Sequence, residues 1–400
     1  MGGQRGAHRD PCRAPKGDGD HAATLPPSRQ RQGVADLPLK GGGAFGPAFS
    51  SSAVHAMNGE WLALAGPPLA AAFLITFAVA VLTTGRVLRR LRARAILDRP
   101  NERSSHDVPT PRGGGIGILA ALLPAWVVVV LLGYSDAAPL VAVAGALLLA
   151  FVSWRDDVGG LSPALRLAVQ ALAVAIGLAV LPGAGTVFQD LLPAWLDRAA
   201  CFVLWLWFVN AFNFMDGIDG IAGTEAAGIG AGVALLALTH LEIVGLGNGL
   251  FGAATAAAAI AFLRWNWQPA RLFMGDVGSV PLGYLLGWLL LTLAGSGYWA
   301  QALILPLYFL ADASWTLLRR LARGEKIWRP HREHFYQRAV QAGRSHAEVA
   351  LRVMSADIVL IGAALWATED MEVPALILAA LTVALLLADL ARPAGAAAVR

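Results

Sequence analysis

Eleven stretches of mostly apolar residues, separated by short polar segments, set the strongest limit on how this chain can fold. A helix that crosses a membrane needs about 20 such residues. Charged residues make up only 14% of the 400 residues, and a soluble protein this apolar would expose large apolar patches. The sequence therefore predicts an all-α integral membrane protein with about eleven transmembrane helices. The predicted spans are 61–85, 116–134, 137–154, 164–182, 199–213, 220–239, 246–264, 277–294, 299–318, 350–368 and 373–391.

The segments between the predicted spans alternate in charge. Segment 86–115 carries eight Arg, and segment 319–349 carries seven Arg and one Lys. The segments on the other side together hold one basic residue, Arg198. Lys and Arg accumulate in loops on the cytoplasmic side of a membrane. We therefore expect the basic segments and the C-terminus to face the cytoplasm, and the start of the first span to face outward.

Residues 1–56 differ from the rest of the chain. They contain seven Lys/Arg and no apolar run, and they match no secretory signal, in which an apolar stretch follows the basic start. Met57 stands just before the first span. Our hypothesis is that Met57 is the true start and that residues 57–400 form the polytopic membrane domain. The alternative interpretation of residues 1–56 is a disordered tail.

Polar residues gather in five clusters, and each cluster follows an odd-numbered predicted span. The predicted topology places all five at the cytoplasmic face. They lie at 99–115, 154–163, 210–220, 273–279 and 329–338. Each cluster alone has a structural explanation, such as a helix cap or a turn. Together they indicate one site, built at the membrane face from several loops.

The residue types in these clusters indicate phosphate chemistry. Carboxylates close to the hydrocarbon are costly unless they are paired, hydrated or bound to a metal. Oxygen ligands without Cys favour a hard cation such as Mg²⁺ or Mn²⁺, and such a cation usually accompanies phosphate. The carboxylates in question are Asp156, Asp157, Asp216, Asp219 and Asp276. The Arg residues would hold further anionic oxygens, and Gly113–Gly115 would bring backbone N–H groups close to phosphate.

Two pairs of these residues are three positions apart. Asp216 and Asp219 would share a face if they lie on a helix. His331 and His334 have the same spacing, which is also that of half a zinc site. No Cys or third His is near them in the sequence, so a structural zinc site is not expected.

At this point the motifs resemble a known group, the polyprenyl-phosphate N-acetylhexosamine-1-phosphate transferases of glycosyltransferase family 4. The resemblance covers about residues 61–345 and follows the family's motif order. The motifs are Pro100–His106 with Pro109–Gly115, the Asp156-Asp157 pair with Arg166, Asn210-x-x-Asn213-x-x-Asp216-Gly-x-Asp219-Gly, and Gly275-Asp276-x-Gly-Ser279. The family includes initiators of O-antigen, enterobacterial common antigen and teichoic acid synthesis, and the phospho-MurNAc-pentapeptide translocase.

The resemblance implies a reaction and its partners. A UDP-N-acetylhexosamine would donate its sugar-1-phosphate to undecaprenyl phosphate, with release of UMP. Membrane lipids are expected partners and nucleic acid is not, and a homodimer is left open. The expected location is the bacterial inner membrane, with the active site facing the cytoplasm.

The resemblance also implies the roles of individual residues. Asn213 and Asp276 would hold Mg²⁺, or Mn²⁺, on the donor diphosphate. Asp156 would act on the lipid phosphate or position it, with Asp157 beside it, and both are the expected catalytic residues. The expected substrate-binding residues are Arg112, Arg166, Asp216, Asp219, His331, Arg332 and His334. Among these, Asp219 would contact the uracil, and the residues of the last loop would bind the diphosphate.

Several alternatives stay open on the sequence alone. Transfer proceeds either by direct displacement or through a covalent phosphosugar on an Asp; we favour the first, because phosphoryl transfer needs mainly positioning and charge neutralisation. His331-Arg-Glu-His334 lacks the adjacent histidines of the pentapeptide translocase. Together with Arg103-Ser-Ser-His106, this favours the branch that initiates O-antigen or other surface polysaccharides. A transporter is disfavoured, because transporters place their sites near the bilayer midplane in repeated halves.

Overall fold

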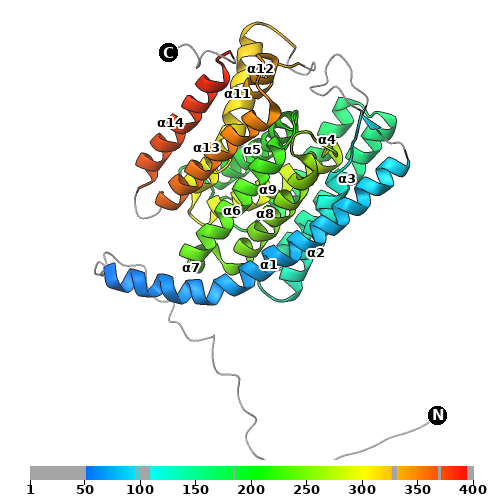
Figure 1. The fold of residues 1–400 in the computed structure, drawn as a ribbon. Coiled ribbons are helices and arrows are strands. Elements are labelled where there is room, and N and C mark those ends of the chain that lie inside the picture. The colour runs from blue at the N-terminus through cyan, green and yellow to red at the C-terminus, as the bar shows by residue number, and fades with distance from the viewer. Residues whose placement is uncertain are drawn as a thin grey trace, which may run out of the picture. The chain divides into compact units, whose positions relative to one another are not determined.

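The structure, a computed structural model, describes residues 51–94, 97–98, 109–183, 185–326, 331–367 and 371–393. The chain divides into two units, Met1–Phe49 and Ser50–Arg400, and all described elements belong to the second. This unit is a helical bundle (Figure 1), which confirms the predicted all-α membrane fold. Within the described residues, the strands are one antiparallel pair of two-residue segments, β1 (Leu97–Asp98) and β2 (Thr110–Pro111).

Nine helices in the described ranges are long and apolar enough to cross a membrane, so the chain is a multi-pass membrane protein. They are α1 (Ser51–Ala93), α3 (Ala138–Gly159), α4 (Pro163–Val180), α5 (Ala194–Met215), α6 (Ile221–Thr239), α8 (Leu246–Asn266), α9 (Asp276–Gly295), α13 (His346–Trp366) and α14 (Glu372–Leu390). All nine coincide with predicted spans. The helix α1 begins at Ser51, ahead of Met57, and the hypothesis that Met57 is the true start stays a prediction.

The two remaining predicted spans are helical but differ in form. The helix α2 (Gly115–Leu131) has 17 residues. The stretch 299–318 is divided into α10 (Trp299–Ile304) and α11 (Leu307–Ala322). The division falls at Pro306, which has no backbone N–H to continue the helix. Two short helices complete the bundle, α7 (Leu241–Val244) and α12 (Phe335–Gln341).

Burial separates the central helices from those at the surface of the bundle. The apolar window of α9 is 100% buried and that of α8 is 78% buried, whereas those of α1 and α4 are each 22% buried. The central position of α8 and α9 is visible in Figure 1. Small residues permit the closest packing: a Cβ at Gly230 of α6 would lie 2.7 Å from the backbone of Ala256 in α8. The buried helix α9 packs against α3 and α5, and the polar residues project from the ends of these helices and of α4.

Candidate active site

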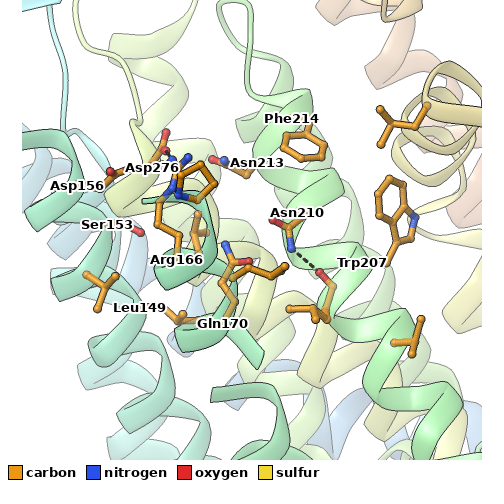
Figure 2. Close-up of a pocket in the computed structure, with 17 residues that line it drawn as sticks. Leu149, Ser153, Asp156, Arg166, Gln170, Trp207, Asn210, Asn213, Phe214 and Asp276 are labelled. Atoms are coloured by element: carbon orange, nitrogen blue, oxygen red, sulfur yellow. Dashed lines mark hydrogen bonds and ion pairs between the residues drawn. The ribbon is translucent and has the colours of Figure 1, made fainter. Parts of the chain in front are cut away.

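Four helix ends meet at one end of the bundle and bring together four predicted site residues. Asp156 lies near the end of α3, Arg166 in the first turn of α4, and Asn213 in the last turn of α5. Asp276 is the first residue of α9. All four line one cavity of about 520 Å³, and Figure 2 shows Asp156, Arg166, Asn213 and Asp276 side by side at its polar end.

Asp276 is placed by a glycine turn. Gly275 has a φ of 74°, a conformation that side chains rarely adopt, and it turns the chain from the loop into α9. The carboxylate at the start of α9 is favoured by the helix dipole. Two guanidinium groups approach it: Arg112 Nη2 lies 2.6 Å from Oδ1, and Arg166 Nη1 lies 3.8 Å from Oδ2.

The same two arginines also bind the aspartate pair on α3. Arg166 Nη1 lies 2.8 Å from Asp156 Oδ2, and Arg112 Nη2 lies 3.4 Å from Asp157 Oδ1. The backbone N–H of Leu161 donates to the other oxygen of Asp156 at 2.6 Å. Two arginines therefore join three carboxylates, and each guanidinium side chain is still 39% exposed. Both arginines remain accessible to a phosphate ligand, which they can bind in bidentate fashion.

The amide of Asn213 is oriented by a serine one turn inside α9. Ser279 Oγ donates to Asn213 Oδ1 at 2.5 Å, which joins the end of α5 to the start of α9. Ser279 was not among the predicted site residues. Its place in the motif Gly275-Asp276-x-Gly-Ser279 was the only signal in the sequence that it belongs to the site.

Asp216 and Asp219 do not lie on one helix, so the condition under which they would share a helical face is not met. The helix α5 ends at Met215 and α6 begins at Ile221, with a turn between them. Asp216 lies in this turn, where burial, followed by the nearby Asp276 carboxylate, raises the pKa of Asp216 well above its usual value.

Asp219 lies apart from the others, buried against α13. Its Oδ1 lies 3.3 Å from His346 Nδ1, and its Oδ2 accepts from the backbone N–H of Ala270 at 3.0 Å. The structure does not bring Asp219 together with the residues of the cavity. Its predicted contact with the uracil stays a prediction.

The glycines Gly113–Gly115 do not offer their amides to a ligand, contrary to expectation. The N–H groups of Gly113 and Gly114 donate to Phe273 O, and that of Gly115 donates to Met274 O. A Cβ on Gly115 would overlap the Gly278 backbone. The absence of side chains at these glycines allows the starts of α2 and α9 to touch. This contact places Arg112 beside Asp276.

Residues 331–336 lie at the same end of the bundle, beside the turn after α5. Tyr336 Oη donates to Phe214 O at 2.9 Å, and Phe214 lines the cavity. The rings of His331 and His334 are 4.9 Å apart. Burial, His334 and Arg320 lower the pKa of His331 to about 4, so His331 is uncharged at neutral pH.

The other predicted residues of this segment are placed as follows. Arg332 lies between the two histidines, and its carbonyl accepts from Gln341 Nε2 at 2.9 Å. Within the described ranges, no group of three or more His, Cys, Asp or Glu side chains is arranged to hold a metal ion by itself. Residues 99–108, with Arg103 and His106, and Arg329 lie outside the described residues.

Gly217 is expected to be required for the contact between Tyr336 and α5. A Cβ at Gly217 would overlap the Tyr336 hydroxyl, and the Tyr336 side chain is fully buried. Gly217→Ala should therefore break the Tyr336–Phe214 hydrogen bond and destabilise the fold by about 1–3 kcal/mol, the usual cost of overpacking. Thermal unfolding in detergent measures this cost. Gly362→Ala is the control, because a Cβ there meets open space; equal melting temperatures for both variants would contradict the expectation.

Guanidinium groups held by carboxylates can stabilise the charge that develops on a transferred phosphoryl group, so this cluster suits an enzyme that transfers a phosphate-bearing group. Comparison with known proteins agrees. The model of the family "Glycosyl transferase family 4" matches residues 139–294. The decaprenyl-phosphate N-acetylglucosaminephosphotransferase of Mycobacterium tuberculosis H37Rv is 32% identical over 371 residues, which cover 78% of this chain and 88% of the relative. The chain belongs to glycosyl transferase family 4 and is a phosphoglycosyltransferase.

Two further relatives show the breadth of the similarity. The probable undecaprenyl-phosphate N-acetylglucosaminyl 1-phosphate transferase of Bacillus subtilis 168 is 27% identical, with 69% of this chain and 78% of the relative covered. The phospho-N-acetylmuramoyl-pentapeptide-transferase of Mycolicibacterium smegmatis is 29% identical, with 56% and 76% covered. The family assigned from the motifs is therefore confirmed.

Proposed function

We propose that the chain transfers N-acetylglucosamine-1-phosphate, or a closely related N-acetylhexosamine-1-phosphate, from a UDP-sugar to a polyprenyl phosphate. An oxygen of the lipid phosphate attacks the phosphorus that carries the sugar. The bond from this phosphorus to the bridging oxygen breaks, and UMP leaves. The product is a lipid-linked diphosphate sugar. In this proposal the transfer takes place at the cytoplasmic face of a bacterial inner membrane.

The two-part character of the cavity is the observation that carries this proposal. Its polar end holds Asp156, Arg166, Asn213 and Asp276. The rest of its wall is mainly apolar and includes Leu149, Val152, Leu167, Val203, Leu206 and Leu317. Leu167 is 49% exposed and Val203 is 62% exposed, so the apolar wall of the cavity reaches the surface of the bundle. A long apolar chain with a phosphate head matches this combination, because each part of the ligand meets surface of its own kind.

Charge at the polar end favours a divalent cation. Asp156, Asp157 and Asp276 share two guanidinium groups, so the carboxylates outnumber the arginines before any phosphate arrives. Mg²⁺ is typically held by one or two protein oxygens together with substrate phosphates and water. The donor set fits this pattern: Asp276 and Asn213 would hold Mg²⁺, or Mn²⁺, which would neutralise the charge that develops on the diphosphate.

Removal of divalent cations should abolish transfer. EDTA is expected to reduce UMP release to background, because the carboxylates would otherwise repel both phosphate substrates. Added Mg²⁺ should restore activity, and Ca²⁺ or Zn²⁺ serves as the comparison. UMP release followed with and without EDTA makes the measurement. Full activity in EDTA after extensive dialysis would exclude the proposed metal site.

The roles of the protein groups follow from the contacts. Arg166 bridges Asp156 and Asp276, so it stands between the proposed acceptor and donor sides of the cavity and would bind both phosphates. Asp156 would position the lipid phosphate or accept its proton. Asp157 lies farther from its arginine, with 3.4 Å between Asp157 Oδ1 and Arg112 Nη2. Its proposed role is to orient that guanidinium. We favour direct displacement; trapping of a phosphosugar–aspartate adduct that turns over competently would overturn this choice.

The relatives support the choice of sugar and acceptor. The names of the Mycobacterium tuberculosis and Bacillus subtilis relatives include N-acetylglucosamine and a decaprenyl or undecaprenyl phosphate. We therefore propose UDP-N-acetylglucosamine as the first donor to test. Initiation of an O-antigen-like surface polysaccharide is the proposed role in the cell. Peptidoglycan synthesis is the second candidate, disfavoured by the spacing of His331 and His334.

A transfer assay tests the proposal. Purified full-length protein is incubated with undecaprenyl or decaprenyl phosphate, Mg²⁺ and a panel of UDP-N-acetylhexosamines. The proposal expects UMP release together with a lipid diphosphate sugar of matching mass. Uptake of a nucleotide sugar into proteoliposomes without any product would instead support a transporter.

A further inference from the structure

One carboxylate outside the cavity collects an unusual number of hydrogen bonds. Asp312 lies within α11 with 0% of its surface exposed. Its Oδ1 accepts from the Thr316 hydroxyl at 3.2 Å and from the Phe335 backbone N–H at 3.0 Å. Its Oδ2 accepts from the Tyr336 backbone N–H at 3.3 Å and from the Tyr308 hydroxyl at 3.5 Å. A buried carboxylate is costly unless it is fully paired, and two of these four donors belong to the start of α12.

The side chain of His334 also contacts this carboxylate. His334 Nδ1 lies 3.2 Å from Asp312 Oδ1, and both side chains are almost fully buried. A carboxylate oxygen only accepts hydrogen bonds, so a hydrogen bond across this contact requires the proton on Nδ1. The other nitrogen, Nε2, is then left for a ligand. A carboxylate at Nδ1–H also stabilises the positive charge of the ring when Nε2 donates to an anion.

The neighbouring histidine has no such partner. His331 is uncharged at neutral pH, as described above, and its Nδ1 accepts from the Glu333 backbone N–H at 3.4 Å. His331 and His334 therefore differ in the partners of their ring nitrogens. Of the two, it is His334 that has a buried carboxylate beside its ring.

We infer that Asp312 is a positioning residue, which orients His334 to bind the donor diphosphate and holds residues 334–336 against the cavity. The inference rests on the proposed function, because it takes a nucleoside-diphosphate sugar as the ligand of His334. The link to the cavity is Tyr336, whose hydroxyl donates to Phe214 O. Asp312 itself touches no substrate and acts through His334.

A double-mutant cycle separates this role from a merely structural one. Asp312→Asn, His334→Ala and the double variant are compared with the full-length wild type, and kcat and KM for the UDP-sugar are measured. Asp312→Asn is expected to raise KM about tenfold, the usual range for a hydrogen bond to a charged group, with kcat changed less than about threefold. In the His334→Ala background the same substitution should change KM less than about twofold. An equal rise in KM in both backgrounds would overturn the inference.

The matched control is Thr316→Val, which removes another donor from the same oxygen of Asp312 without touching His334. Its KM should stay within about twofold of wild type. A KM raised as much as that of Asp312→Asn would show that general disturbance of α11, and not His334, causes the effect.

A second measurement does not depend on the folding of any Asp312 variant. Nitrogen-15 NMR of histidine-labelled wild type reports the protonation of each ring nitrogen, and His334→Gln assigns the signal. A proton on Nδ1 is expected; a neutral ring with its proton on Nε2 would overturn the inference. If the wild type transfers no sugar phosphate, the proposed function fails and the diphosphate part of the inference fails with it. The NMR result then still decides whether Asp312 orients His334.

Discussion

Asp276→Asn is expected to lower the rate of transfer by about 10³-fold, the scale seen when a group that stabilises developing charge is removed. Asp276 is the carboxylate that both arginines approach, at 2.6 Å and 3.8 Å, and it is the proposed ligand of the cation. The isosteric amide removes the charge and preserves the shape. Initial rates of UMP release under saturating substrates measure the effect.

The control for Asp276 is a carboxylate with a similar ion pair elsewhere in the bundle. Asp389 on α14 pairs with Arg344 at 2.6 Å, and it lines no part of the cavity. Asp389→Asn removes the same charge, and its rate should stay within about threefold of wild type. If Asp276→Asn keeps near-normal turnover, or if both variants lose activity equally, the proposed role of Asp276 is wrong.

Asp156→Asn is expected to lower kcat by about 10²-fold, within the range of general acid–base catalysis, and to leave donor binding intact. Asp156 forms an ion pair with Arg166 at 2.8 Å and accepts a hydrogen bond from the Leu161 backbone N–H at 2.6 Å. These two contacts hold its carboxylate at the wall of the cavity. Loss of its charge should impair the acceptor side of the reaction. Turnover, together with equilibrium binding of the UDP-sugar, makes the measurement.

The neighbouring Asp157 provides the comparison for Asp156. It lies on the same turn of α3 but contacts Arg112 at 3.4 Å, and it is not among the residues that line the cavity. Asp157→Asn should therefore lower kcat less than Asp156→Asn does. Loss of UDP-sugar binding in Asp156→Asn would argue against its acceptor-side role.

Much of the fold was predictable because length and apolarity alone decide whether a segment can span a membrane. Even the two least regular predicted spans, 199–213 and 220–239, are the helices α5 and α6. The break at Pro306 was missed, because the apolar run continues across it. The short form of α2 was missed for a similar reason: apolarity extends beyond the helix end at Leu131.

The candidate site was predictable as a set of residues but not as a set of contacts. The sequence motifs predicted that Asp156, Arg166, Asn213 and Asp276 belong to one site, and all four line one cavity. The sequence does not reveal pairings between distant residues. Asp312 and His334 are examples, joined across the start of α12.

The glycine run 113–115 shows how one motif permits two interpretations. A Gly-rich turn suits both a phosphate cradle and a close backbone contact. The structure shows the second, because the three N–H groups already donate to Phe273 and Met274. Only the position of the α9 start, fixed by tertiary packing, distinguishes the two.

The most direct test of the central claim is whether UMP release and lipid product appear together. Purified full-length protein is given polyprenyl phosphate, Mg²⁺ and UDP-N-acetylglucosamine, and both products are quantified, with Asp276→Asn as the reference. The account predicts equal amounts of UMP and lipid diphosphate sugar from the wild type, and both formed about 10³-fold more slowly by the variant. UMP release without the lipid product, or no reaction with any UDP-sugar in folded protein, would contradict it.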